Sequence, residues 1–141
     1  MIKDVLINIK GVQGIDDESD TIEFISEGRF GFKDGEYFIS YDESGMLDSG
    51  ETVKTKIHIN SSDSVVLQRS GSIKSRMLIE KNKRNTTFYA TPFGELLIGV
   101  FGEEIDYNLS ENGGEINLKY TIDSDLRLVS RNYVNIKIKE V

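Results

Sequence analysis

Turn signals recur about every ten residues along this chain, and this spacing limits its fold more than any other feature. Asp34-Gly35 separates two runs in which apolar and polar residues alternate, which is a strong signal for a β-hairpin. Asn112-Gly113-Gly114 occupies the same kind of position later in the chain. The intervals between such breaks are too short for most α-helices. The spacing therefore predicts an all-β protein.

Between the turns, the residues alternate between apolar and polar with a period of two. The clearest runs cover residues 4–10, 22–33, 53–59, 115–122 and 134–139. A strand with this alternation buries one face and leaves the other in water, which is typical of antiparallel sheets. We count about ten such strands and expect no helix. The length of 141 residues suits one domain, so we expect a single β-barrel domain over residues 1–141.

Two of the runs are unusually long. They cover residues 21–33 and 126–139, which is 13 and 14 residues, whereas a strand usually has about five or six. Gly28 lies within the first run on its apolar face, where a missing side chain lets the strand bend inward. Closing the sheet would also remove the edges that so many strands expose. The sequence therefore predicts an antiparallel meander β-barrel of about eight to ten strands.

Several short segments also resemble a known family, in matching order from Ile7 to Ile138. They are Glu27-Gly28, Tyr37-x-x-x-Tyr41-x-Glu43, Arg69-x-Gly71, Ser75-x-Met77 and Tyr89-x-Thr91-Pro92-x-Gly94. Together these segments resemble the YwiB-like family of small bacterial proteins of uncharacterised function. The resemblance implies a calycin-like (lipocalin-like) β-barrel and brings no substrate, cofactor or catalytic residue. The chain has no tryptophan, so it lacks the Gly-x-Trp signature of true lipocalins.

Composition excludes several classes of function. The chain has no cysteine, which excludes disulfides, thiolate zinc sites and thiol nucleophiles. His58 is its single histidine and lies on the polar side of its run, beside Lys54 and Lys56. The remaining acids show no paired spacing, so we nominate no catalytic residue, no metal site and no cofactor. We expect a protein that is not an enzyme, although the sequence leaves this open.

Arg69 is the most informative charged residue. It continues the apolar parity of Val65 and Leu67, so if these two face the barrel lumen, the guanidinium does too. A buried guanidinium needs a carboxylate, a carbonyl or a ligand anion, because an unpaired buried charge is very costly. If Val66 is the inward residue instead, Arg69 lies in solvent. The sequence leaves both orientations open.

Tyrosines supply the other candidate site residues. A phenol has an apolar ring and a polar tip, which suits an amphipathic ligand, although barrels also use such rings to fill the core. We therefore predict, as the leading function, that the lumen binds a small, partly apolar ligand with an acidic or polar group. The candidate ligand-binding residues are Arg69, Tyr37, Tyr41, Tyr89 and Tyr120.

An alternative function follows from charge. Residues 69–85 contain six basic residues and one acidic residue, a local charge of +5 in a chain whose net charge is −7. Such asymmetry predicts an interaction module in which Lys81, Lys83 and Arg84 contact an acidic partner or RNA. RNA binding is disfavoured because bases stack on aromatic side chains, and no aromatic residue lies among these cations before Phe88. A solvated hairpin is the alternative. The overall acidity makes duplex DNA an unsuitable partner.

Location is predicted from what the sequence lacks. No apolar run approaches the roughly 18 residues that a membrane-spanning helix needs, so we expect no membrane partner. The first residues, Met1 to Val5, show no signal-peptide pattern. We therefore expect a cytoplasmic protein. The sequence does not decide its oligomeric state.

Overall fold

The computed structural model describes residues 2–15, 18–42, 53–71, 74–91 and 94–141, without the side chains of residues 15, 90 and 91. These ranges contain ten strands and no helix, as predicted. The strands are β1 (Ile2–Ile15), β2 (Glu18–Lys33), β3 (Glu36–Asp42), β4 (Val53–Ser61), β5 (Ser64–Gly71), β6 (Ser75–Glu80), β7 (Arg84–Thr91), β8 (Gly94–Ser110), β9 (Gly113–Ser124) and β10 (Arg127–Glu140). No helix in the described ranges is long and apolar enough to span a membrane.

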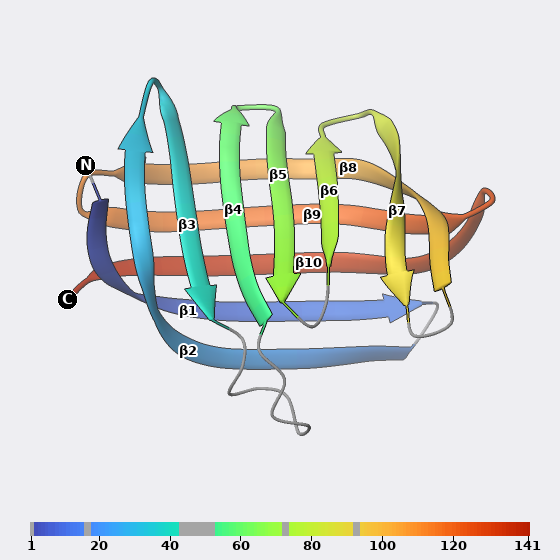
Figure 1. Cartoon of the computed structure of the whole chain (residues 1–141), viewed down its shortest axis with the longest axis horizontal. Coiled ribbons are helices and arrows are strands. Elements are labelled where there is room, and N and C mark those ends of the chain that lie inside the picture. The colour runs from blue at the N-terminus through green and yellow to red at the C-terminus, as the bar shows by residue number, and fades with distance from the viewer. Residues whose placement is uncertain (1, 16–17, 43–52, 72–73, 92–93) are drawn as a thin grey trace.

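All ten strands belong to one sheet, in the order β6-β5-β4-β3-β2-β1-β10-β9-β8-β7. Each pair of neighbours in this order is antiparallel. The sheet curls into two layers whose strands cross: β3 to β7 run across the front, and β1, β9 and β10 run behind them (Figure 1). This arrangement confirms the predicted antiparallel barrel.

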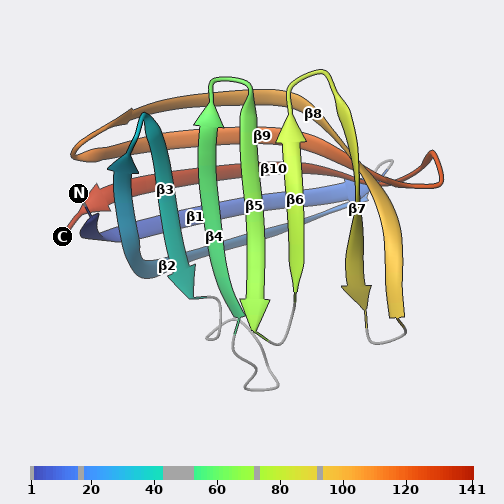
Figure 2. The ribbon, with the colours of Figure 1, turned by 45° about the horizontal axis from the view of Figure 1, so that its top comes forward.

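Strand β2 passes from the rear layer to the front layer (Figure 2). It pairs with β1 from Glu18 to Gly31 but with β3 only from Gly28 onward. A Cβ atom added at Gly28 would overlap the carbonyl oxygen of Ser40 and lie 2.5 Å from Cδ1 of Ile7. Glycine therefore lets three strands approach one another where β2 changes layer, and the bend predicted at Gly28 is present.

β6 and β7 are the two edge strands of the sheet. The barrel is nearly closed because these two edges meet through side-chain contacts. Hydrogen bonds from side chains of β7 to the backbone of β6 connect the two strands, in place of a backbone ladder. The Thr87 hydroxyl donates to the carbonyl oxygen of Arg76 at 2.9 Å, and the Asn85 amide donates to that of Leu78 at 3.4 Å. The seam between β6 and β7 is thus held by side-chain hydrogen bonds.

Inward side chains from both layers form one hydrophobic cluster. Phe30, Ile39 and Ile57 come from the front layer, and Ile7 and Ile136 come from the rear layer. Each of them is at most 1% exposed, so these side chains fill the space between the layers. The polar side chains of the front layer consequently point outward.

Candidate functional site

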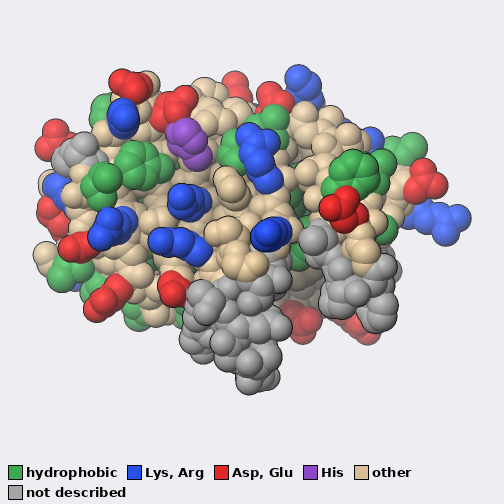
Figure 3. Space-filling view, viewed as in Figure 1, with side chains coloured by type: hydrophobic (Ala, Val, Ile, Leu, Met, Phe, Trp, Pro, Cys, Tyr) green, Lys and Arg blue, Asp and Glu red, His purple; other side chains and the backbone are tan. Residues whose placement is uncertain are grey.

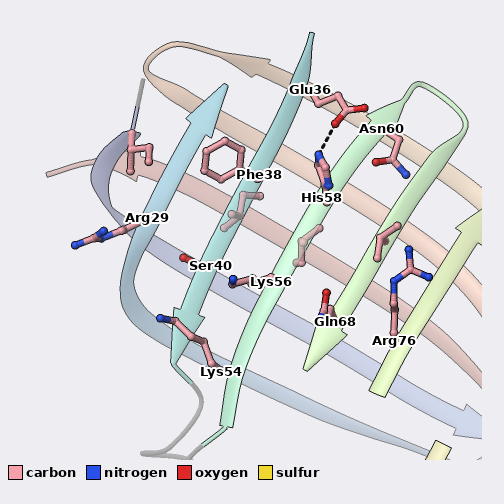
Figure 4. Close-up of a pocket in the computed structure, with 14 residues that line it drawn as sticks. Arg29, Glu36, Phe38, Ser40, Lys54, Lys56, His58, Asn60, Gln68 and Arg76 are labelled. Carbon is pink, nitrogen blue, oxygen red and sulfur yellow. Dashed lines mark ion pairs between the residues drawn. The ribbon is translucent and has the colours of Figure 1, made fainter. Parts of the chain in front are cut away.

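A hollow of about 740 Å³ lies on the outer face of the front layer, over strands β2 to β6 (Figure 4). Its lining comes mainly from outward-facing positions on these strands. Four cations line it: Arg29, Lys54, Lys56 and Arg76. Lysine and arginine side chains gather over the centre of this face (Figure 3). We call this surface the basic face.

Strand register arranges part of the basic face as a straight row. Direct cross-strand pairs connect Arg29 to Ser40, Ser40 to Lys56, Lys56 to Gln68, and Gln68 to Arg76. Cations therefore occupy every second strand of this basic row. Because neighbouring strands are about 4.8 Å apart, successive cations are about 10 Å apart. The basic row runs perpendicular to the strands.

A second row lies beside the basic row, one outward position further along each strand. It pairs Gly31 with Phe38, Phe38 with His58, and His58 with Val66. We call these four residues the aromatic row, because two rings stand at its centre. Phe38 is half-buried and has no side chain beside it on β2, where Gly31 is its partner. The His58 imidazole contacts the Glu36 carboxylate, with Nε2 and Oε2 2.5 Å apart.

Charges on the basic face are weakly compensated. Arg29 Nε is 3.9 Å from Asp4 Oδ1, and both side chains are highly exposed, so this ion pair contributes little. Among the described residues, no carboxylate forms a salt bridge with Lys56 or Arg76. Like charges held at fixed spacing on a sheet create a positive potential that attracts anions. The basic face is therefore locally positive, although the net charge of the whole chain is −7.

Among the residues predicted to bind a ligand in the lumen, Tyr37 lies apart from the others. Its hydroxyl donates to the carbonyl oxygen of Leu109 at 3.3 Å, and its ring stacks on Phe30 with 5.7 Å between centroids. Tyr41, four residues further along β3, is buried about 13 Å away. The structure therefore places Tyr37 in an aromatic cluster at the opposite end of its strand.

Arg69 and Tyr89 each lie within electrostatic reach of Tyr120. Arg69 is the direct cross-strand partner of Thr55 and Ser75, both buried, so the inward orientation is the one present. Burial raises the pKa of the Tyr120 hydroxyl, the charge of Arg69 opposes that rise, and Tyr89 adds to it. The Thr55 hydroxyl is also buried here and has no hydrogen-bond partner among the described residues.

The three cations predicted to contact a partner, Lys81, Lys83 and Arg84, differ in their surroundings. Arg84 donates two hydrogen bonds to the Asp123 carboxylate, from Nε at 2.9 Å and from Nη2 at 2.7 Å. This pairing lowers the pKa of Asp123. Lys83 lies 3.8 Å from Glu80, and Lys81 is exposed at the turn. Contact of Lys81, Lys83 and Arg84 with a partner stays a prediction.

Sequence reasoning missed the basic face because it grouped cations by their distance along the chain. Arg29, Lys56 and Arg76 come from three different strands. Alternation of Lys54, Lys56 and His58 with apolar residues did indicate an outward-facing cationic strip on one strand. Only the register of five strands joins that strip to Arg29 and Arg76.

Comparisons with known proteins agree on the fold. A family model described as a domain of unknown function, DUF1934, matches residues 7–136. The chain is 28% identical over 116 residues to the uncharacterized beta-barrel protein YwiB of Bacillus subtilis (strain 168), covering 82% of this chain and 79% of that protein. It also resembles the crystal structure of the ywiB protein from Bacillus subtilis, with a TM-score of 0.86 and 24% identity over 99% of this chain and 93% of the other. The resemblance drawn from the sequence is thus confirmed, and the chain belongs to the DUF1934 family.

Proposed function

We propose that this protein is a non-enzymatic binding module that captures an anionic partner on its basic face. The observation that carries the proposal is the basic row, in which Arg29, Lys56 and Arg76 line one hollow of an otherwise acidic chain. The proposal keeps the interaction module predicted from the sequence but moves its contact from Lys81, Lys83 and Arg84 to the outer face of strands β2 to β6, where Arg76 is the basic residue that the segment 69–85 shares with the basic face. We also propose that the protein acts in the cytoplasm, the location expected from the sequence.

The exposure of these cations defines what kind of partner fits. A single exposed ion pair is weak, since water screens it and two flexible side chains lose freedom. Useful affinity therefore requires a partner that contacts several cations at once. The Debye length is about 8 Å at physiological ionic strength, so binding should weaken steeply as salt rises. A partner with a series of anionic groups meets both conditions.

Heparin, a flexible polyanion, is the probe for this proposal. We expect the protein to be retained on immobilised heparin despite its net charge of −7, and to be eluted by salt. The double variant Lys56→Glu/Arg76→Glu should elute at a clearly lower salt concentration. The matched control is Lys137→Glu/Lys139→Glu, which makes the same charge change at exposed positions of β10. Equal elution of the two variants would mean that net charge alone governs binding and would contradict the proposal.

A second proposal retains the small ligand predicted for the lumen. It is supported by the electrostatic effects of Arg69 and Tyr89 on Tyr120 and by the buried hydroxyl of Thr55, the cross-strand partner of Arg69. An acidic or polar group of a partly apolar ligand would pair with Arg69 there. Native mass spectrometry of protein purified from its own host should then show a co-purified mass that Arg69→Ala removes. If no mass is found and Arg69→Ala lowers the melting temperature, Arg69 is a structural residue.

A further inference from the structure

We infer that the anionic partner of the basic face is single-stranded nucleic acid, whose phosphates follow the basic row while its bases lie on the aromatic row. This inference rests on the proposed function and names the partner. Its first support is the arrangement of the two rows. Alternate residues of a strand are about 7 Å apart, so the rows run side by side at that distance across β2 to β5. A strand of nucleic acid likewise carries charge along one side and flat rings along the other.

Phe38 is the second support. Proteins that bind single strands without sequence preference combine a positive groove with aromatic side chains on which bases stack. Phe38 lines the hollow together with Arg29 and Lys56, and its neighbour on β2 is Gly31, which has no side chain to cover the ring. Figure 4 places the Phe38 ring on the same outer face as the labelled cations. The aromatic residue missing from segment 69–85 is thus supplied by another strand.

Uncharged polar side chains also line the hollow, as does the Glu36 carboxylate that contacts His58. Ser40 and Gln68 stand between the cations of the basic row, and Asn60 lines the hollow beyond His58. A hydroxyl and two amides can each donate and accept, so they suit sugar hydroxyls and exposed base edges. In a duplex the base faces are stacked inside and cannot reach Phe38. A peptide of glutamates alone would satisfy the cations but would have no ring to place on the aromatic row.

Fluorescence anisotropy with labelled homopolymers of about 12 nucleotides, a length within the usual site sizes, tests this inference. Oligo-U RNA and oligo-T DNA are the two single-stranded arms, and a duplex of equal length and an oligoglutamate peptide are the comparison probes. We expect both single strands to bind more tightly than the duplex and the peptide. A preference for the RNA arm would assign a contact to the ribose 2′-hydroxyl, and equal affinity would assign binding to phosphate and base alone.

Phe38→Ala separates the inference from the proposed function. It should weaken single-strand binding on the order of tenfold, as expected for the loss of one base stack, and leave elution from heparin unchanged. Phe38→Leu keeps apolar bulk without an aromatic ring and provides the same test if the alanine variant does not fold. Phe88→Ala is the matched control, because Phe88 is an exposed aromatic residue on β7, outside the basic face.

Salt dependence gives an independent readout. Arg29→Gln and Lys56→Gln should each reduce by about 0.7 the slope of log affinity against log salt, since each removes one contact with a phosphate of a single strand. If both Phe38 variants bind single strands as tightly as the unmodified protein, the inference is overturned, while heparin elution by the Lys56→Glu/Arg76→Glu variant still decides the proposed function. Duplex or peptide binding that equals single-strand binding would also overturn it. Failure to bind heparin and every oligonucleotide would overturn both.

Discussion

Replacement of Gly28 by alanine should distort the point where β2 changes layer. The new Cβ would overlap the carbonyl oxygen of Ser40 and lie 2.5 Å from Cδ1 of Ile7, whereas carbon atoms in contact are ordinarily about 3.5–4.0 Å apart. The end of the Ile7 side chain can move, but Ser40 contributes backbone, so β3 itself must shift. Overpacking of this kind costs about 1–3 kcal/mol. We therefore expect Gly28→Ala to lower the free energy of unfolding by about 2 kcal/mol, and the melting temperature by roughly 6 °C.

The matched control is Gly11→Ala on β1, because a Cβ added there meets no atom within 4 Å. That substitution should leave stability unchanged or raise it by about 0.4–1 kcal/mol, since alanine reduces the freedom of the unfolded chain. Urea denaturation followed by circular dichroism measures both variants, and calorimetry gives their melting temperatures. If Gly28→Ala and Gly11→Ala unfold at the same urea concentration, β2 does not need glycine at its bend, and the reasoning is refuted.

Three further substitutions test other parts of the barrel. Thr87→Val removes the hydroxyl that donates to Arg76 across the seam, so it should cost about 1 kcal/mol and speed amide exchange in β6 and β7; unchanged exchange would contradict the role given to the seam. Thr55→Val removes a buried hydroxyl without a partner among the described residues, so it should raise the free energy of unfolding in urea by about 1 kcal/mol, and a decrease would show that the hydroxyl is satisfied. Because Arg84 lowers the pKa of Asp123 below its ordinary value of 3.8, the carboxylate stabilises the fold above that pH and loses this effect as the pH falls through its folded pKa. The difference in melting temperature between the unmodified protein and Asp123→Asn should accordingly be constant near neutral pH and shrink below about pH 4, and a difference independent of pH would refute the pairing.

Much of the fold was predictable because it depends on local chemistry. Asp34-Gly35 does form a turn, with φ of 54° and 82° at its two residues, a backbone conformation that this dipeptide readily adopts. The alternation of Val53, Ile57 and Ile59 with polar residues likewise indicated which face of β4 is buried, and these three side chains are at most 1% exposed. Period-two patterns report burial directly, since successive side chains of a strand point to opposite faces.

The candidate site required the tertiary structure, for a reason of geometry. Arg29, Phe38 and Arg76 lie on three strands, and their sequence separations contain no information on which residues become cross-strand partners. A shift of one residue in the register of any strand would turn its outward side chains to the core. The sequence alone determined that strands with one polar face would form a barrel. The long-range pairing of β2 to β6 decided which of those polar side chains stand in one row, and so where this protein presents a surface to a partner.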